Sequence, residues 1–439
     1  MKNELLIFYL RKILRLNSAQ KIIDFSVRRH KNKIFLIEPD KNKTLTFKEF
    51  DQESSKLSNE LKGDIHFYSA QNSIEYFLTR TACYKAGTIF FGLSPNLTQE
   101  TKNYFINKAN ALKGSTELSG ISTLNLSSGT TQKIPKIIKL SEQNWIESLY
   151  NYVLNSNTAI NEKVIFLSTL PFTTAGSTTF LPAILAGITY IIIKEDSPAS
   201  KIAENIQKYS VNRLYTTPFR LLELMDWCKD NNTELKSLKA IIIGTERMPK
   251  QMFTEAINFF GPIIQEGYGM AEALPPISLC GKIAKNVSVK LIDDGRIAVK
   301  SKTVSAGYLD NPEENKRSFV NGWFYSNDWG RVENGFLYFY GRYDDIITNT
   351  PKRIFASEIE DKIYSLELVK NCILLKKEER TYAFITIKNN AEKEAAMEQI
   401  LKLLQNEFAQ IKISLILKES LPLNFAGKID RNLLKAEAA

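Results

Sequence analysis

The chain has 439 residues and a mass of 50.0 kDa; 44% of its residues are hydrophobic and 24% are charged, with a net charge of +10. This composition is typical of a globular protein and argues against a disordered or fibrous one, and the length predicts two to three domains of ~150 residues. Only two His and four Cys are present, and no CxxC pair occurs. Zinc chemistry of the HExxH type is therefore excluded, a disulfide framework is not expected, and a cytoplasmic location is predicted.

The start of the chain is strongly basic: the first 50 residues hold twelve Lys and Arg against five Asp and Glu. The apolar run 5–10 is short and is followed by Arg11 and Lys12, which predicts an amphipathic helix rather than a signal peptide. We favour a solvated Lys-rich surface here, and contact with an acidic partner or a membrane is the less favoured interpretation. The sequence shows no basic stripe with interleaved aromatic residues, so nucleic-acid binding is not predicted.

Strand and helix patterns alternate through the middle of the chain. Buried strands are predicted at residues 65–68, 88–93, 164–167, 190–193, 213–215 and 240–243. Residues 44–61 predict a strand start and an amphipathic helix, and residues 72–86 predict a helix that stops at Gly87. Residues 198–208 predict another helix, capped by Ser197. This alternation predicts layers of parallel α/β units.

The pattern changes after about Gly281. Short strands with turn residues between them are predicted at 287–292, 295–300 and 337–340, and they indicate a small β subdomain. The last segment mixes strands at 372–375 and 382–387 with a helix over 391–408. The predicted fold is α/β: a large N-terminal domain of parallel α/β layers plus the small β subdomain (1–343), then a small α+β C-terminal domain (344–439).

The first stretch with candidate binding residues is LSSGTTQKIPK at residues 126–136. Four hydroxyl side chains flank one Gly there, and two Lys follow. Backbone N–H groups and hydroxyls of such a loop can wrap a polyphosphate. The loop is not a P-loop, because GxxxxGK[ST] is absent. Taken alone, a flexible polar surface loop explains the stretch equally well.

Four later stretches each offer one charged group. Glu272 closes the segment EGYGMAE, where a carboxylate can hold Mg²⁺. Asp328 lies between aromatic residues and can accept two hydrogen bonds from a ribose diol. Arg342 begins the run RYDD and offers a fork for phosphate or ribose oxygens, and Lys428 follows a Gly near the end of the chain. Singly, each is also explained by a turn, a linker or a solvated surface.

In this order and spacing, these stretches resemble the adenylate-forming superfamily of acyl- and aryl-CoA ligases, stand-alone adenylation domains and luciferases. The resemblance spans residues 44–431. It implies that ATP and a carboxylic acid, fatty or aromatic, give acyl-AMP and pyrophosphate with the help of Mg²⁺. It also implies transfer of the acyl group to a thiol, either of CoA or of the phosphopantetheine of an acyl carrier protein.

The resemblance also assigns roles to residues. The expected ATP- and AMP-binding residues are Ser127, Ser128, Gly129, Thr130, Thr131, Lys136, Tyr268, Gly269, Asp328 and Arg342. The expected catalytic residues are Lys428, Glu272 and Arg342, with Glu272 also the metal ligand and Asp344 the hinge of the C-terminal domain. The expected substrate-pocket residues are Phe172, Thr173, Gly176, Gly244, Gly267 and Met270.

The sequence departs from the family pattern at several positions. Ala271 replaces a hydroxyl residue, and Pro351 stands where a Gly is usual in the loop that faces the thiol. Because Pro lacks an N–H and fixes φ, the interpretation tilts toward a carrier protein as acceptor. Thr173 replaces the Asp of amino-acid activators, which favours a fatty or aromatic acid, since a buried ammonium without a partner is costly. Two alternatives stay open: an amino-acid adenylation enzyme, and a non-catalytic nucleotide- or acyl-binding relative.

Overall fold

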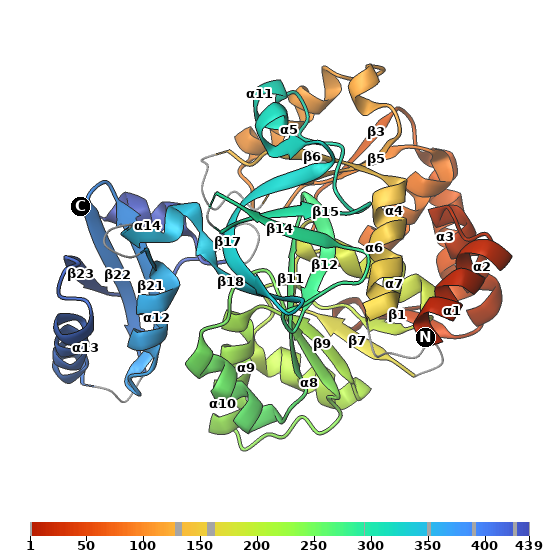
Figure 1. Ribbon diagram of the computed structural model, residues 1–439. Coiled ribbons are helices and arrows are strands. Elements are labelled where there is room, and N and C mark those ends of the chain that lie inside the picture. The colour runs from red at the N-terminus through yellow and green to blue at the C-terminus, as the bar shows by residue number, and fades with distance from the viewer. Residues whose placement is uncertain are drawn as a thin grey trace.

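The structure is a computed structural model of the whole chain. It describes residues 2–127, 134–155, 163–293, 295–348, 353–388, 392–424 and 428–438. In Figure 1 the N-terminal helices lie on one side of the molecule and the C-terminal part lies on the other, with β-sheets and their covering helices between them. Within the described ranges, no helix is both long and apolar enough to cross a membrane.

The largest sheet has a parallel half. In spatial order it consists of β11 (Ile264–Met270), β10 (Ala240–Ile243), β9 (Arg213–Thr216), β7 (Ile165–Ser168), β8 (Thr189–Ile191) and β1 (Ile34–Glu38), with β2 (Lys43–Thr46) antiparallel at the edge. One face packs on α8 (Ala199–Tyr209), α9 (Pro218–Asp230) and α10 (Lys250–Phe260). The other face packs on α6 (Glu142–Asn155) and α7 (Phe180–Leu185). Coverage on both faces explains why these strands are nearly continuous apolar runs.

The same sheet continues into an antiparallel half that curls over the carboxyl ends of the parallel strands. It contains β12 (Ala273–Leu279), β13 (Lys282–Ile283), β18 (Phe336–Arg342), β17 (Trp323–Glu333), β15 (Arg296–Lys300) and β14 (Ser288–Ile292), and β16 (Phe319–Val320) pairs with β17. The short α11 (Pro312–Ser318) precedes β16. A small buried cluster around Ile277 and Ile297 fills the space between these strands.

A second sheet lies beside α4 (Ile74–Ala86) and α5 (Gln99–Asn110). It consists of β3 (Ile65–Tyr68), β4 (Ile89–Gly92) and β5 (Ile121–Leu126) in parallel, with β6 (Ile137–Ser141) antiparallel to β5. Helix α4 packs against α3 (Phe47–Glu60), and it ends where Gly87 takes a left-handed conformation with φ 69°. The N-terminus adds α1 (Lys2–Phe8), a π-helical turn over Tyr9–Ile13 and α2 (Ala19–His30).

The C-terminal part is α+β. The strands β19 (Ile346–Thr348) and β20 (Ile354–Phe355) pair, followed by a three-stranded sheet of β21 (Val369–Lys377), β22 (Arg380–Ile387) and β23 (Ile413–Leu417). The helices are α12 (Ala356–Tyr364), α13 (Lys393–Glu407) and α14 (Arg431–Glu437). Helix α12 contacts α10, and the side chains of Arg247 and Asp361 form an ion pair across this contact. Lys370 and Asp226 form another between β21 and α9, with N and O atoms 3.5 Å apart.

The fold class predicted from the sequence is confirmed, and the predicted strands occur with bounds shifted by a few residues. One local prediction was wrong: α8 begins at Ala199 with Pro198 at the cap position, and Ser197 does not cap it. Proline supplies the extended φ and ψ of a cap residue, so the hydroxyl is not needed there. Helix α13 spans Lys393–Glu407 instead of 391–408, and Ala391 lies outside the described residues.

Candidate active site

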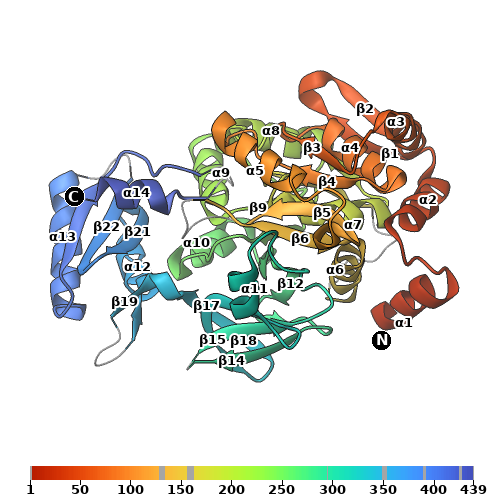
Figure 2. The ribbon, with the colours of Figure 1, turned by 90° about the horizontal axis from the view of Figure 1, so that it is seen from above.

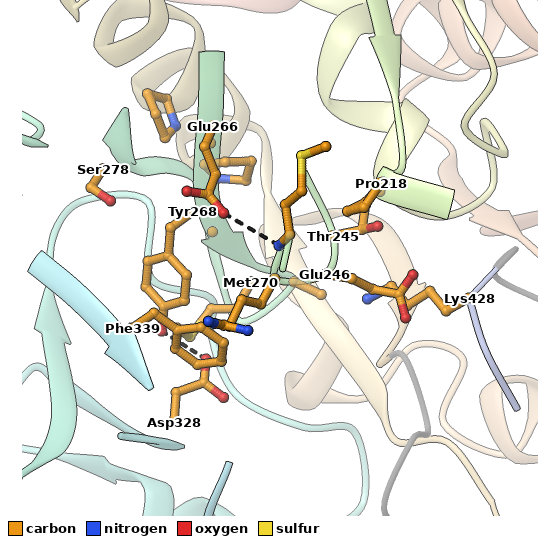
Figure 3. Close-up of a pocket in the computed structure, with 18 of the residues that line it drawn as sticks. Pro218, Thr245, Glu246, Glu266, Tyr268, Met270, Ser278, Asp328, Phe339 and Lys428 are labelled. Atoms are coloured by element: carbon orange, nitrogen blue, oxygen red, sulfur yellow. Dashed lines mark hydrogen bonds between the residues drawn. The ribbon is translucent and has the colours of Figure 1, made fainter. Parts of the chain in front are cut away.

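A large cavity of about 1910 Å³ lies where the carboxyl ends of β9, β10 and β11 meet β17, β18 and the C-terminal part. Loops that follow parallel strands all leave the sheet at this edge, so their polar residues gather there. Figure 3 shows Pro218 after β9 and Thr245 and Glu246 after β10, with Lys428 from the C-terminal part next to Glu246. The cavity therefore has walls from three separate parts of the chain.

Asp328 is held in place by two partners in this cavity. The hydroxyl of Tyr268 donates to Asp328 Oδ2 at 2.7 Å, and Arg342 Nε lies 3.5 Å from Oδ1. Asp328 and Arg342 are register partners on β17 and β18, so the strand pairing itself brings the two charges together. The Asp328 N–H donates to the hydroxyl of Ser326 at 3.1 Å, which fixes the backbone.

Tyr268 also forms part of a flat aromatic wall. Its ring lies 5.5 Å from the ring of Phe339, centroid to centroid, at an interplanar angle of 31°. Burial and the nearby Asp328 carboxylate raise the pKa of the Tyr268 phenol well above its ordinary value, so it stays a hydrogen-bond donor. The wall and the carboxylate next to it can hold a planar heterocycle and a diol attached to it.

Glu272 lies on the cavity wall and accepts a hydrogen bond from the hydroxyl of Tyr308 at 3.0 Å. Burial raises the pKa of Glu272, and the Tyr308 hydroxyl and the charges of Arg342 and Lys136 oppose that shift. The described residues contain no cluster of three or more His, Cys, Asp or Glu that could hold a metal ion. A single carboxylate of this kind fits Mg²⁺, which usually binds one or two carboxylates together with substrate phosphates.

Lys136 lies between the phosphate-loop candidates and α11. Its ammonium is 2.7 Å from Glu314 Oε1 and 4.6 Å from the centre of the Tyr308 ring. The Lys136 N–H donates to the Ser127 hydroxyl at 2.9 Å, and the Ser127 N–H donates to the Lys136 carbonyl at 2.9 Å. These bonds close the base of the predicted loop. Its other candidates, Ser128, Gly129, Thr130 and Thr131, lie outside the described residues.

Lys428 is half-buried and lies among charged groups of the cavity. Burial and the positive charge of Arg342 lower the pKa of Lys428 to about 8, whereas Glu246, Asp328 and Glu272 oppose the shift. The residues on either side are paired: the Asn424 N–H donates to the Lys428 carbonyl at 2.7 Å, and Leu423 forms a β-bridge with Ile429. Lys428 is thus an ammonium in the presence of three carboxylates that need a counter-charge.

Glu246 was not predicted from the sequence, yet it lies directly beside Lys428 (Figure 3). Burial raises the pKa of Glu246, opposed by the charges of Lys428 and Arg431 and by a hydrogen bond from the Ile429 backbone N–H. The available signal was its place three residues after the end of the buried strand Ala240–Ile243, at the sheet edge where polar side chains gather. Tyr308 was also missed, because no motif marks it.

Asp344 lies in the turn Tyr343–Asp345 that links β18 to the C-terminal part, and its exposed side chain borders the cavity. Its neighbour Asp345 accepts from the Arg342 N–H at 3.0 Å and pairs with the Arg431 guanidinium. One carboxylate therefore joins the strand that carries Arg342 to the helix that follows Lys428.

The rest of the cavity is an apolar branch between α6, α7 and the parallel strands. Its apolar lining comes from Val153, Phe166, Pro182, Ala183, Leu185, Ala186, Ile188, Tyr215 and Ile242. Alternation along the strands creates it: Ile242 faces the branch, and its neighbours Ile241 and Ile243 face the helices on the other side. The branch can hold an aromatic or aliphatic group.

Two of the six predicted substrate-pocket residues, Gly267 and Met270, line the cavity. Phe172 packs instead in an aromatic cluster, 5.2 Å from the Tyr76 ring and 5.3 Å from the Phe77 ring. The described lining also leaves out three further predicted residues: Thr173, Gly176 and Gly244. Residues adjacent to them do line the cavity: Thr174, Ala175, Ser177 and Thr245. The predicted segment is therefore beside the cavity, but neighbouring residues face it. The predicted nucleotide residue Gly269 does line it.

Comparisons with known proteins agree with this architecture. The sequence model of the AMP-binding enzyme family matches residues 115–309. The 2-succinylbenzoate–CoA ligase of Listeria monocytogenes is 27% identical over 336 residues, which are 73% of this chain and 70% of that protein. A medium/long-chain fatty-acid–CoA ligase of Mycobacterium tuberculosis is 26% identical over 307 residues, 62% of this chain and 54% of that protein.

Among solved structures, O-succinylbenzoate CoA synthetase of Bacillus subtilis in complex with ATP and magnesium ion superimposes with a TM-score of 0.79. It is 21% identical, and the match covers 94% of this chain and 99% of that one. The matched family model and these relatives agree with the resemblance that the sequence motifs carry. The solved structure has the same α/β fold as this chain.

Proposed function

We propose that the protein activates a carboxylic acid with ATP, giving acyl-AMP and pyrophosphate, and then transfers the acyl group to a thiol. The observation that carries this proposal is the convergence of Lys428, Arg342, Glu272 and Asp328 on one cavity that also has an apolar branch. The similarity to CoA ligases for aromatic and fatty acids supports it. The protein is an AMP-forming acid–thiol ligase.

The polar end of the cavity suits the nucleotide. Asp328, fixed by Tyr268 and Arg342, accepts hydrogen bonds from the ribose hydroxyls, and the wall of Tyr268 and Phe339 packs on the adenine. Lys136 and the loop that Ser127 closes bind phosphate oxygens. Glu272 holds Mg²⁺, which when bound neutralises phosphate charge. The similarity to a synthetase that binds ATP and magnesium ion supports these assignments.

In the first step a carboxylate oxygen of the acid attacks the α-phosphorus of ATP, and the bond from that phosphorus to the pyrophosphate oxygen breaks. Two anions must meet, so the barrier falls when a fixed cation lies between them. Lys428 and Arg342, which both line the cavity, supply that charge. The cavity also holds the acid and the nucleotide in line, which removes part of the entropy cost of the reaction.

In the second step a thiol sulfur attacks the acyl carbonyl carbon, AMP leaves with the mixed-anhydride oxygen, and the thiol proton passes to solvent. Lys428 occupies the site in this structure, so the C-terminal part (344–439) would rotate about Asp344 to admit the thiol. The CoA ligases among the relatives favour CoA over a carrier protein as acceptor. The acid is fatty or aromatic rather than an amino acid, a choice that the similarity to CoA ligases for such acids supports.

The decisive experiment measures pyrophosphate release from ATP with panels of fatty, aryl and amino acids, with and without CoA. Lys428→Ala serves as the matched inactive control. Release with one acid class, plus AMP and acyl-CoA when CoA is present, is the expected result. Release that never yields acyl-CoA would assign the thiol to a carrier protein, and ATP binding without release for any acid would contradict the ligase assignment.

A further inference from the structure

The N-terminal helical segment has an apolar face that nothing in the described structure covers. Leu5, Phe8, Tyr9 and Ile13 are exposed to 65%, 57%, 48% and 60%, respectively. Their spacing of three to four residues places them on one side of α1 and the turn that follows it. The opposite side, with Leu6, Ile7, Leu10 and Leu14, packs on the main core, so the segment is anchored while this face stays in solvent.

The charge around this face, here called the N-terminal face, is positive. Residues 1–15, which form this segment, contain four Lys and Arg and one Glu. Lys12 and Arg15 are exposed on the same segment, and Lys302 borders a small hollow together with Lys12. Two nearby carboxylates are already paired: Glu4 with Lys285 and Glu147 with Arg11, each with N and O atoms 2.6 Å apart. The surface therefore presents a net positive charge.

Helix α1, which carries part of the N-terminal face, lies close to residues that line the cavity. Asn3 Nδ2 donates to the Leu154 carbonyl at 3.5 Å, and Lys285, which pairs with Glu4, donates its backbone N–H to Asn155 Oδ1 at 3.1 Å. Asn155 and its neighbours Tyr152 and Val153 line the cavity. Figures 1 and 2 both place α1 on the side of the molecule away from the C-terminal part. Contact there would leave the C-terminal part free to move.

We propose that the N-terminal face docks on a negatively charged lipid surface. An interfacial helix of this kind buries a strip of large apolar side chains among acyl chains and keeps basic residues at the phosphate level. A protein partner needs a wider patch, about 800 Å² on each side, whereas a lipid surface needs only a strip as wide as one helix. The docking stands independently of the proposed ligase activity, and it would bring the apolar branch near a source of lipid-soluble acids.

The test is co-sedimentation of the full-length protein with vesicles of phosphatidylcholine alone and of phosphatidylcholine mixed with phosphatidylglycerol. The expected result is about tenfold stronger binding to the anionic vesicles, lost when the ionic strength rises from about 0.1 to about 0.5 M. Equal binding to both kinds of vesicle, or binding to neither, would overturn the proposal.

Two variants separate the apolar and the charged contributions. The triple change Leu5→Ser, Phe8→Ser and Ile13→Ser should abolish binding, and Lys12→Glu with Arg15→Glu should weaken it about tenfold or more. The matched control is Leu401→Ser with Tyr104→Ser, which removes apolar side chains exposed to 44% and 45% elsewhere and should bind like the unchanged protein. Thermal unfolding checks that each variant folds, and the charge variant remains informative if the triple variant does not.

Other occupants would give different results. If a second copy of the chain covers the N-terminal face, ultracentrifugation will detect a dimer that the triple variant loses, and vesicles will not bind. If an acidic protein covers it, an acidic acyl carrier protein will bind in a salt-sensitive way while anionic vesicles do not. Either result would overturn docking on lipid.

Discussion

The two ends of the cavity are built in different ways. At the nucleotide end, polar side chains hold one another: Tyr268 and Arg342 contact Asp328, and Tyr308 donates to Glu272. At the acyl end, apolar side chains from two helices and three strands share the lining, and no single residue dominates it. The nucleotide end depends on a few particular polar side chains. The acyl end depends on the shape of the cavity that many apolar side chains enclose together.

This difference explains what each end allows. A charge or a hydrogen bond requires a particular residue at a particular place, so substitution there should cost much in activity. An apolar wall tolerates exchange among residues of similar volume, so substitution there should shift preference among acids more than it reduces rate. Substitutions at the two ends should therefore differ both in the size of their effect and in the property that they change.

Lys428→Ala should reduce acyl-AMP formation about 10²- to 10³-fold, because a fixed cation that stabilises developing charge is worth that much in mutagenesis of other enzymes. Thioester formation from supplied acyl-AMP should remain largely intact, since Lys428 would not occupy the site in that step. Single-turnover assays of the two steps measure both quantities. Lys412→Ala, an exposed Lys in the C-terminal part, is the control, and equal loss of both steps in Lys428→Ala would contradict its role.

The sequence predicts the nucleotide end better than the acyl end for the same reason. The order of four short motifs follows a family pattern and marks Asp328, Arg342, Glu272 and Lys428. The sequence placed Tyr268 near the nucleotide but could not predict its hydrogen bond to Asp328. That bond joins β11 and β17, which are not neighbours in the sheet, so it depends on the three-dimensional arrangement of the strands.

The acyl end could not be predicted in this way. The sequence places residues 170–176 beside the cavity but does not show that Phe172 faces an aromatic cluster while Thr174 and Ala175 face the cavity. That outcome depends on how the loop after β7 turns, which no local pattern specifies. The fold class, by contrast, follows from the alternation of apolar strands and amphipathic helices, which recurs through the middle of the chain.

Asp328→Ala should weaken ATP binding by about 10- to 100-fold, because hydrogen bonds to a charged group, such as this half-buried carboxylate, contribute roughly 1.5–3 kcal/mol. Removing it also leaves the Tyr268 hydroxyl and Arg342 without their shared partner. Isothermal titration with ATP measures the affinity. Asp328→Asn keeps the shape but not the charge and should give an intermediate loss; unchanged ATP affinity in Asp328→Ala would place the ribose elsewhere.

The pH dependence of acyl-AMP formation tests the charge on Lys428. Its pKa is lowered to about 8 and the reaction needs the protonated ammonium, so the rate should fall as pH rises through about 8. Glu246→Gln removes a carboxylate that favours the ammonium, so it should move this fall to lower pH and reduce the rate a few-fold at neutral pH. Glu234→Gln, at an exposed site, should leave the profile unchanged. A profile that Glu246→Gln does not move would separate Glu246 from the lysine.

The smallest effect is expected on β11, where Gly267, a predicted substrate-pocket residue, and Gly269, a predicted nucleotide residue, make a matched pair. A Cβ added at Gly267 would meet only the Ile243 carbonyl oxygen, at an ordinary 3.7 Å, whereas one at Gly269 would lie 2.5 Å from Pro275 Cβ. Gly267→Ala should therefore fold normally and bind ATP unchanged. It should lower kcat/KM for the bulkiest acid by about tenfold relative to a small one, the usual cost of one methyl group in a tight pocket.

Gly269→Ala should instead lower the melting temperature, because Pro275 must move to admit the methyl group. Thermal unfolding and kcat/KM across a series of acids distinguish the two variants. If Gly267→Ala weakened ATP binding as much as Asp328→Ala, the two ends would not be separate, and the acyl group would have to lie against another wall. If Gly267→Ala changed only the selectivity among acids, the acyl group would lie against the cavity wall at Gly267.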